Sequence, residues 1–477
     1  MSLSVRAAAA ERPGGDALVA PAGTLSWSAL AGAVLADAGR LAADAGLGRA
    51  NGPARVALTA RSDAPTVVRL LALIELGVPF APLHPRLTAP EREAQLAALA
   101  PVLDLDGLEP VDPFEAAGAS RAAPSFGPAA VDDDERPLAL VVTSGTAGAA
   151  RAAILSRRAF AAAAAASAAR LGWREDDRWL LALPLARVGG LSIVTRCLAG
   201  RRAIVLADDL SPEALAAASR ELRPTLISLV PAQLARLLGA EPGSGSFACP
   251  PSAFRVVLLG GAAVSAGLLR EACGRQLPVL PTYGMTETCA QVATVPPGLP
   301  PDAANGCGPT LPGVELRTTD GRIEVRGPTL FSGYLGAAGT PFDPGGWFAT
   351  RDLGRLDARG FLHLDGRLDE LIIVGGENVA PGEVEAALAS APGVFAALVF
   401  GVSDETLGEV VGAALVRGAG PPPDDDALGR WLAGRLAPFK RPRRLAWVDA
   451  LPETPDGKPD RRGAARRLGA ALRPFRS

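Results

Sequence analysis

The sequence predicts an α/β protein: a large N-terminal domain with doubly covered mostly parallel sheets plus a β-subdomain, then a small α+β C-terminal domain. In residues 1 to about 100, and again regularly from Leu138, apolar strands alternate with Ala- and Leu-rich helices, which is typical of a sheet covered on both faces. After Asn305 short strands with Gly and Pro turns indicate the β-subdomain. Beyond GRLDELIIVGGEN the pattern changes again, to a unit of about a hundred residues, an ordinary domain size.

The first hundred residues contain the start of this alternation. Strands are predicted at 55–59 and 78–83, and a helix between them at 64–76. The stretch 101–137 is acidic, rich in Ala and Pro, and without sustained periodicity. It is interpreted as a connection on the surface and not as a true linker.

From Leu138 onward the alternation is regular and predicts the main sheet. The strands are expected at 138–142, 179–183, 203–206, 226–230, 256–259 and 279–280. The helices are expected at 156–171, 190–198, 212–222, 231–238 and 266–273. Ligands of such sheets bind at the carboxyl ends of the strands, so the loop that follows Val142 is a candidate site.

The second half of the chain is predicted to contain the β-subdomain and a separate C-terminal domain. Strands at 314–317, 322–326 and 361–364 place the β-subdomain near 305–365. The boundary is placed at 366–369, giving domains 1–366 and 367–477. The C-terminal domain is expected to contain helices 381–389 and 427–436 and strands 395–402 and 410–416.

Composition restricts the class of protein. The hydrophobic fraction is 48% and the net charge is -2, which favours a large globular interior and no nucleic-acid partner. No apolar run is long enough for membrane insertion, and the N-terminus has no signal-peptide core. The five cysteines have no CxxC spacing, which predicts a reducing compartment and no structural zinc. A cytoplasmic protein is expected, and the sequence does not decide whether it forms a homodimer.

Basic residues are almost all arginine. Lys440 and Lys458 are the two lysines among 48 basic residues. A lysine kept in such a chain is expected to do something that arginine cannot do. Histidine, tyrosine and methionine are equally scarce, with two residues of each type.

The stretch after the strand at 138–142 has the composition of a phosphate-binding loop. It contains the hydroxyls and glycines Thr143, Ser144, Gly145, Thr146 and Gly148. Glycines let the backbone N–H groups approach an anion, and hydroxyls add donors without bulk. An ordinary Ser/Gly turn between two strands is the alternative at this point.

Three more stretches carry candidate chemistry. The first is PTYGMTETCAQ, which contains the ring of Tyr283, the hydroxyl of Thr286 and the carboxylate of Glu287. These groups suit the binding of a nucleotide with magnesium. A buried tyrosine and a threonine that caps a helix explain the same residues equally well. Asp352 is expected in a turn, where its carboxylate could bind the vicinal hydroxyls of a ribose. Arg367 could bind a phosphate or the ribose. Solvated turn charges are the alternative for both. Lys458 lies in a Pro/Gly turn, where an exposed tail lysine is the alternative.

Together these stretches resemble the adenylate-forming superfamily of acyl-CoA synthetases, luciferase-like enzymes and peptide-synthetase adenylation domains, over nearly the full length. The resemblance implies ATP, Mg²⁺ and coenzyme A as cofactor and co-substrates, a carboxylic acid substrate, and a mobile C-terminal domain that rotates about a hinge. It implies that Thr143–Gly148 binds phosphate and that Gly260, Gly261, Ala262 and Tyr283 flank adenine. It further implies that Thr286 contacts the α-phosphate, Glu287 is the metal ligand and Asp352 binds the ribose. Arg367 would directly precede the hinge residue Asp369. Gly375 and Gly376 would line the tunnel for CoA, and Lys458 would be the lysine that acts in adenylation.

The phosphate loop departs from the superfamily pattern in one respect. Where the pattern continues Gly-Lys-Pro-Lys-Gly, this chain has Ala149, Ala150, Arg151 and Ala152 after Gly148. Arg151 occupies the second lysine position and is expected to supply the charge there.

The acyl-binding side is sought in ALPLARVGGLSIVTRCLAG. Arg196 interrupts an apolar helix and is expected either to meet a carboxylate of the substrate or to reach the surface with its stem buried. The pattern PLxxVGGLSIxxR, with Arg187, Gly190 and Ser192 as further candidates, resembles the o-succinylbenzoate-CoA ligases of menaquinone biosynthesis. The alternatives are a ligase for another aryl or medium-chain acid, a non-catalytic nucleotide binder, and an enzyme that loads a carrier protein.

Overall fold

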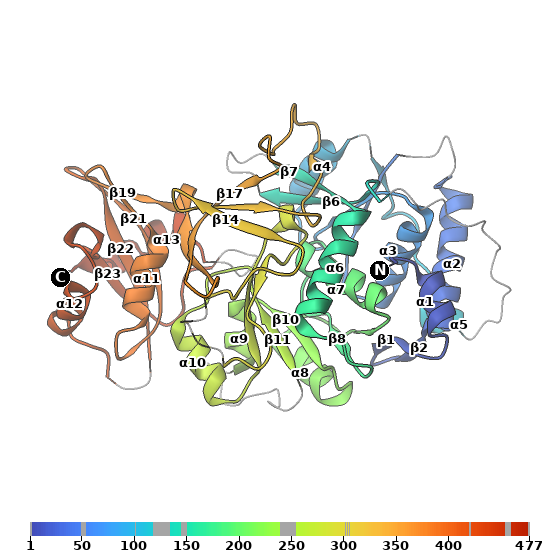
Figure 1. The fold of residues 1–477 in the computed structure, drawn as a ribbon, viewed down its shortest axis with the longest axis horizontal. Coiled ribbons are helices and arrows are strands. Elements are labelled where there is room, and N and C mark those ends of the chain that lie inside the picture. Colours follow the sequence, from blue (N-terminus) through green and yellow to red (C-terminus); the bar gives the residue numbers. More distant parts are fainter. Residues whose placement is uncertain are drawn as a thin grey trace.

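The computed structural model describes residues 2–48, 54–100, 102–117, 134–144, 150–238, 254–300, 302, 304, 306–418, 421–453 and 459–475. Figure 1 shows the N-terminal part of the chain on the right and the C-terminal part, in red, on the left. The predicted α/β class is confirmed. In the described residues no helix combines the length and the apolar character that crossing a bilayer requires.

Two sheets form the body of the molecule. The larger has eight strands in the order β13-β12-β11-β10-β8-β9-β1-β2, with parallel pairing from β12 through β1. Its strands are β1 Asp16–Ala20, β2 Gly23–Ser26, β8 Arg178–Leu180, β9 Ala203–Val205, β10 Leu226–Leu229, β11 Val256–Leu259, β12 Val279–Tyr283 and β13 Ala293–Thr294. The second sheet has the order β16-β7-β6-β4-β3-β5, in which β6, β7 and β16 pair antiparallel. Its strands are β3 Val56–Thr59, β4 Phe80–Leu83, β5 Leu103–Asp104, β6 Pro137–Ser144, β7 Ala150–Ser156 and β16 Gly333–Tyr334.

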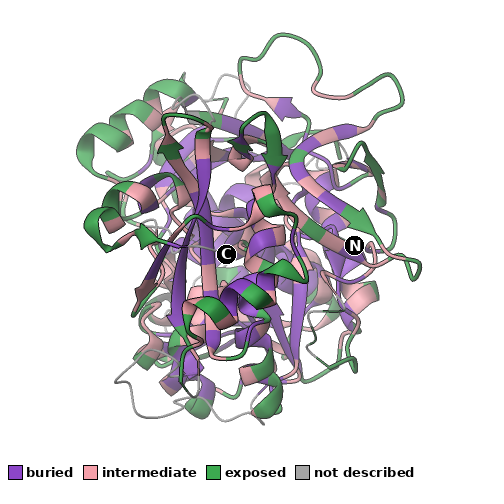
Figure 2. Cartoon of the chain, turned by 90° about the vertical axis from the view of Figure 1, so that its left-hand side faces the viewer, coloured by how far each residue is buried: buried purple, intermediate pink, exposed green. Residues whose placement is uncertain are grey.

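Helices cover both faces of the larger sheet. One apolar cluster joins the two sheets and takes in α2, α3, α6 and α7, and a second cluster lies under α8, α9 and α10. Figure 2 shows the purple, buried strands inside and the green, exposed segments outside. The helices are α1 Val5–Glu11, α2 Trp27–Asp44, α3 Ala64–Leu76, α4 Ala89–Leu99, α5 Pro113–Ala117, α6 Arg157–Leu171, α7 Val188–Gly200, α8 Pro212–Glu221, α9 Pro231–Leu238 and α10 Ala266–Gly274.

Helix α3 illustrates why the pattern specifies these elements. The carboxylate of Asp63 accepts the N–H of Thr66 at 2.9 Å, and Pro65 occupies the first turn, where no N–H is needed. Gly77 ends the helix with φ +66°, a conformation that glycine adopts without strain. The predicted bounds 64–76 are confirmed.

A third, antiparallel sheet follows in the order β14-β15-β17-β18. Its strands are β14 Glu315–Thr319, β15 Arg322–Arg326, β17 Phe348–Leu356 and β18 Leu362–Arg367. The expectation that Asp352 lies in a turn is wrong, because Asp352 is in the middle of β17 and pairs with Arg367 of β18. The alternating burial of β17 places the Asp352 side chain on its inner face.

The C-terminal unit has its own sheet and core. The strands are ordered β20-β19-β22-β23-β24, and β21 pairs with β22. The elements are β19 Ile372–Val374, β20 Glu377–Val379, α11 Pro381–Ala389, β21 Val394–Asp404, β22 Gly408–Arg417, α12 Asp425–Ala433, β23 Arg444–Val448, α13 Arg461–Leu468 and β24 Arg473–Pro474. The unit meets the larger sheet at α10, where a Cβ on Gly267 would lie 2.2 Å from the carbonyl oxygen of Phe395. The domain boundary at 366–369 stays a prediction.

Candidate active site

The loop after β11 lies directly against β12. A Cβ on Gly260 would be 2.8 Å from the Cγ2 of Thr282 and 3.0 Å from its carbonyl oxygen, so only glycine fits without a shift. Gly261 has φ +81°, which also favours glycine, and Ala262 follows half-buried. Gly260 therefore brings the backbone of this loop against Thr282, the residue before Tyr283, at the carboxyl edge of the sheet where ligands bind.

Tyr283, Asp352 and Arg367 form one hydrogen-bonded group. The Tyr283 hydroxyl donates to Oδ2 of Asp352 at 2.7 Å, and Nη1 of Arg367 donates to Oδ1 at 2.7 Å. The hydroxyl of Thr350 accepts the Asp352 N–H at 3.1 Å and donates to the Ile323 carbonyl at 2.8 Å. Burial, and then the Asp352 charge, raise the pKa of Tyr283 well above its usual value. Tyr283 is therefore a neutral donor that fixes the carboxylate.

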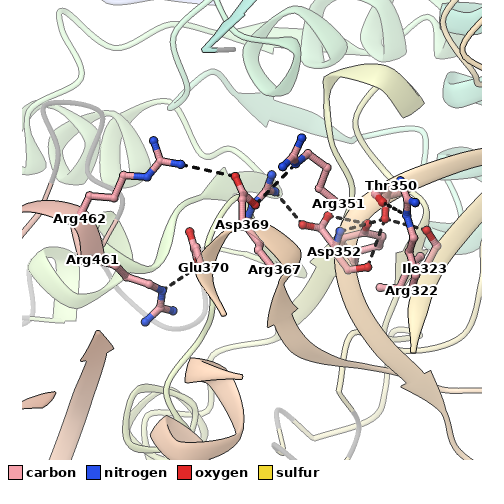
Figure 3. A network of polar contacts seen from close by, with 11 residues as sticks. Arg322, Ile323, Thr350, Arg351, Asp352, Arg367, Asp369, Glu370, Arg461 and Arg462 are labelled. Carbon is pink, nitrogen blue, oxygen red and sulfur yellow. Dashed lines mark hydrogen bonds and ion pairs between the residues drawn. The ribbon is translucent and has the colours of Figure 1, made fainter. Parts of the chain in front are cut away.

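Arginines surround the carboxylate of Asp369, in the turn Leu368–Glu370 between the third and fourth sheets. Nε of Arg367 donates to Oδ1 at 3.1 Å, Nε of Arg351 on β17 lies 3.8 Å from Oδ1, and Nη2 of Arg462 on α13 lies 3.7 Å from Oδ2. Figure 3 shows these side chains converging on Asp369. Asp369 thus makes charged contacts both with arginines of the third sheet and with Arg462 of the C-terminal unit.

Glu287 is held by the segment that ends in Tyr334. The turn Thr286–Thr288 follows β12, and the Tyr334 hydroxyl donates to Oε1 of Glu287 at 2.7 Å. The guanidinium of Arg151 lies over the Tyr334 ring, 5.6 Å from its centroid. Burial, and then the charge of Glu287, raise the pKa of Tyr334 above its usual value. Sequence reasoning did not assign Tyr334 to the site, although the scarcity of tyrosine was a usable signal.

Glu287 carries a negative charge that the described residues do not neutralise. It forms no ion pair with any described side chain, and Thr286 places a hydroxyl next to it. No group of three or more His, Cys, Asp or Glu residues that could hold a metal occurs in the described part of the chain. One carboxylate fits Mg²⁺, which is commonly bound by one or two carboxylates together with substrate phosphates and water.

Arg196 is a buried cation on α7. Its side chain is 3% exposed, and its Nε and Nη2 have no hydrogen-bond partner among the described residues. It lies over the Trp179 ring of β8, 5.5 Å from the ring centroid. Burial lowers the pKa of Arg196 to about 10, opposed by the nearby thiol of Cys289. The alternative in which its stem alone is buried is wrong.

The other acyl-side candidates pack the start of α7. A Cβ on Gly190 would lie 2.3 Å from the carbonyl oxygen of Pro184, which explains the glycine. The Ser192 hydroxyl donates to the Gly189 carbonyl at 2.8 Å, and the residue is 1% exposed. Arg187 is half-buried at the N-cap position of α7. These contacts hold α7 in place, and any contact with substrate stays a prediction.

Several candidates are described incompletely or lie elsewhere. Gly145, Thr146, Gly148 and Lys458 lie outside the described residues, and only the backbone of Ser144 is described, paired with Ala150. The Thr143 hydroxyl, at the end of β6, donates to the Arg151 carbonyl at 3.3 Å.

Gly375 and Gly376 form the turn of the β19–β20 hairpin, with φ +59° and +91°. Figure 1 shows β19 far to the left of β10 and β11. The Gly375 N–H donates to the Leu407 carbonyl at 2.9 Å, so this turn is bonded within the C-terminal unit. Lys440 lies within the C-terminal unit, where its Nζ donates to both oxygens of Glu383 at 2.8 and 2.7 Å.

The Tyr283–Asp352 pair lies at the carboxyl edge of a mostly parallel sheet, where ligands of such sheets bind, and a small second unit follows it in the chain. The sequence model of the AMP-binding enzyme family matches residues 5–335, and that of the AMP-binding enzyme C-terminal domain matches residues 383–458. The chain belongs to the AMP-binding enzyme family, and it is an adenylate-forming, AMP-forming acid-CoA ligase.

Two relatives indicate different acids. The 2-succinylbenzoate-CoA ligase of Bacillus licheniformis is 36% identical over 67% of this chain and 68% of its own length. The indoleacetate-CoA ligase of Aromatoleum aromaticum is 33% identical over 94% of each chain.

Solved structures match the whole chain. The o-succinylbenzoate CoA synthetase of Bacillus subtilis in complex with its acyl-adenylate intermediate has a TM-score of 0.79 at 28% identity, over 99% of each chain. A double mutant of that enzyme bound to a product analogue has a TM-score of 0.68 at the same identity and coverage. The ATP-bound MatB of Rhodopseudomonas palustris has a TM-score of 0.82 at 27% identity, over 98% of this chain and 99% of that chain.

Proposed function

We propose that this chain activates o-succinylbenzoate with ATP and transfers the acyl group to coenzyme A. The observation that carries the proposal is the guanidinium of Arg196, which is 3% exposed and has two nitrogens without partners in the described chain. It lies beside Cys289, the residue directly after the Thr286–Thr288 turn. An acid with two carboxylates brings one to react and a second to pair with this buried charge.

In the first half-reaction a carboxylate oxygen of the acid attacks the α-phosphorus of ATP, a P–O bond forms, and pyrophosphate leaves. Acid and ATP are both anions, so the site has to offset their repulsion. We assign this role to the backbone N–H groups of the Thr143–Gly148 loop, the Thr286 hydroxyl and the ammonium of Lys458. Glu287 would hold magnesium, which would supply positive charge to offset the charge of the departing pyrophosphate.

The Tyr283–Asp352 pair is proposed to bind the nucleoside. Each oxygen of Asp352 already accepts one hydrogen bond, and a carboxylate has about four acceptor positions. Two positions stay available for the vicinal hydroxyls of the ribose. The Gly260–Ala262 backbone and the Tyr283 ring are proposed to flank the adenine.

In the second half-reaction the sulfur of coenzyme A attacks the acyl carbon, the thiol proton goes to solvent, and AMP leaves. The Gly375–Gly376 turn is proposed to line the path of the thiol after the C-terminal unit rotates about Asp369. The higher TM-score with the acyl-adenylate complex than with the product-analogue complex supports an adenylate-forming arrangement here.

The choice of acid is tested by coenzyme-A-dependent AMP formation with o-succinylbenzoate, indoleacetate, benzoate and octanoate. The proposal predicts strong preference for o-succinylbenzoate. The coverage of the indoleacetate-CoA ligase supports a second candidate, an aryl monocarboxylate. Turnover of indoleacetate in preference to o-succinylbenzoate would establish that candidate, and AMP from none of the four acids would contradict both.

The role of Lys458 is tested by separating the two half-reactions. Lys458→Ala is expected to lower adenylation about a hundredfold, the value of one preorganised charged donor, and to spare thioesterification of a supplied acyl-adenylate. Lys440→Ala is the matched control, because Lys440 is the other lysine and pairs with Glu383. Equal loss of both half-reactions in Lys458→Ala would contradict the assignment.

A further inference from the structure

The short segment Phe331–Tyr334 holds Glu287 at two points. The backbone N–H of Phe331 donates to the Glu287 carbonyl at 2.9 Å, and the Tyr334 hydroxyl donates to Oε1 of its side chain at 2.7 Å. The Phe331 and Tyr334 rings meet edge to face, with centroids 4.9 Å apart. The backbone and the carboxylate of Glu287 are therefore both bonded by this one segment.

The same tyrosine also contacts the strand that follows the phosphate loop. Gly333 and Tyr334 form β16, which pairs with Ile154 and Ala153 of β7. β7 begins at Ala150, and its second residue, Arg151, places its guanidinium over the Tyr334 ring. Tyr334 thus connects the start of β7 to the Glu287 carboxylate across the sheet edge.

The bond to Tyr334 orients Glu287 without neutralising it. A phenol is a neutral donor, so the carboxylate keeps its full charge, and its Oε2 accepts no hydrogen bond from the described residues. Asp352 differs, because Arg367 as well as Tyr283 contacts it. A carboxylate that is oriented but not paired with a cation has the properties of a metal ligand.

We propose that Tyr334 is a positioning residue for magnesium-ATP, which acts by fixing the Glu287 carboxylate relative to the start of β7. The proposal rests on the proposed function, since it takes Glu287 as the magnesium ligand. Partners that hydrogen-bond a ligating carboxylate typically contribute 10- to 100-fold in metal affinity. Removing the hydroxyl is therefore expected to weaken the contribution of magnesium to nucleotide binding by roughly tenfold.

The experiment measures the affinity of the full chain for a non-hydrolysable ATP analogue by calorimetry, with and without magnesium. Tyr334→Phe keeps the ring contacts with Phe331 and Arg151 and removes only the hydroxyl. Tyr283→Phe is the matched control, because it removes the other tyrosine hydroxyl, which also donates to a carboxylate at 2.7 Å. Glu287→Gln removes the proposed ligand itself.

In the wild type, magnesium is expected to increase affinity, and this gain should fall roughly tenfold in Tyr334→Phe. In Tyr283→Phe affinity should fall equally with and without magnesium, so the gain is kept. Adenylation gives a second readout, because excess magnesium should restore kcat in Tyr334→Phe, whereas a purely structural defect would persist. If the magnesium-dependent increase in affinity is kept in Tyr334→Phe and lost in Glu287→Gln, the role of Tyr334 is overturned and the proposed function stands. No gain in the wild type would overturn both.

Discussion

The two tyrosines of this chain each donate to a carboxylate at 2.7 Å, but the carboxylates differ in charge balance. Asp352 is 8% exposed and is also bonded by Arg367, whereas Glu287 is half-buried and has no ion-pair partner among the described residues. Similar donors therefore serve two purposes. At Asp352 the tyrosine completes a neutralised group that shapes the surface for a nucleoside. At Glu287 it orients a charge that stays available for a cation.

Arg196 resembles Glu287 in lacking a partner of opposite charge, but its own charge is positive. It is a buried cation whose Nε and Nη2 have no hydrogen-bond partner in the described chain. Charges paired within the chain stabilise the scaffold, while charges left unpaired cost stability and are expected where a ligand supplies the partner. The predictions below test this distinction, from the largest expected effect to the smallest.

The two carboxylates should respond differently to loss of charge. Asp352→Asn and Glu287→Gln should each lower adenylation by roughly a hundredfold, since each removes a charged contact to the reactants. Only Asp352→Asn should also lower the free energy of unfolding, by about 2 kcal/mol, because it removes the negative charge that strengthens the hydrogen bond from Arg367. Thermal unfolding beside pyrophosphate release measures both effects. A loss of stability in Glu287→Gln as large as that in Asp352→Asn would contradict the distinction.

Replacing Arg196 by methionine should stabilise the protein. Burial lowers the pKa of Arg196 to about 10, which is still well above neutral pH, so at neutral pH the guanidinium is charged and the full cost of the buried charge is present. At about 1.4 kcal/mol for each pKa unit this cost is about 3 kcal/mol, partly offset by the contact with Trp179. Chemical denaturation of Arg196→Met should show a higher free energy of unfolding. A marked loss of stability would mean that the guanidinium is paired within the chain.

Arg196→Lys should make binding of the acid depend on pH near neutrality. Burial disfavours the charged form of any base, and a lysine starts from a lower pKa of about 10.4, so its pKa here is expected near about 8. The ammonium loses its charge as pH rises through that value. The KM for o-succinylbenzoate should therefore rise between about pH 7 and 9 in Arg196→Lys and stay level in the wild type. Parallel pH profiles would contradict the assignment.

The contact of Arg462 with Asp369 should have the smallest effect. The two groups lie 3.7 Å apart and the Arg462 side chain is 71% exposed, so solvent screens the pair. Arg462→Glu should lower adenylation about two- to threefold at low salt, and the difference should vanish in high salt. Arg466→Glu makes the same charge change on an exposed position of α13 and should have no effect. Equal effects of both substitutions would exclude a specific contact at Asp369.

The sequence predicted the elements whose apolar pattern is strong and local. Helices α3 and α11 and strands β11 and β15 have the predicted bounds, because each is defined by its own periodicity, caps or turns. Asp352 was expected in a turn because β17 mixes charged residues with a glycine, and its burial depends on pairing with β15 and β18.

Three features of the candidate site arise from tertiary contacts. Tyr334 and Glu287 are 47 positions apart, so their hydrogen bond depends on how β16 reaches β7. The burial of Arg196 is fixed by Trp179, which comes from another element. The arginines around Asp369 come from β17, β18 and α13. Local periodicity contains no information about such long-range neighbours.

The most direct test of the central claim is the specificity of Arg196→Met in coenzyme-A-dependent AMP formation. Kcat/KM is measured for o-succinylbenzoate and for indoleacetate in the wild type and the variant. If the unpaired charge of Arg196 binds the second carboxylate, kcat/KM should fall about a hundredfold for o-succinylbenzoate and stay nearly constant for indoleacetate. Equal changes for both acids, or no change for o-succinylbenzoate, would contradict the account.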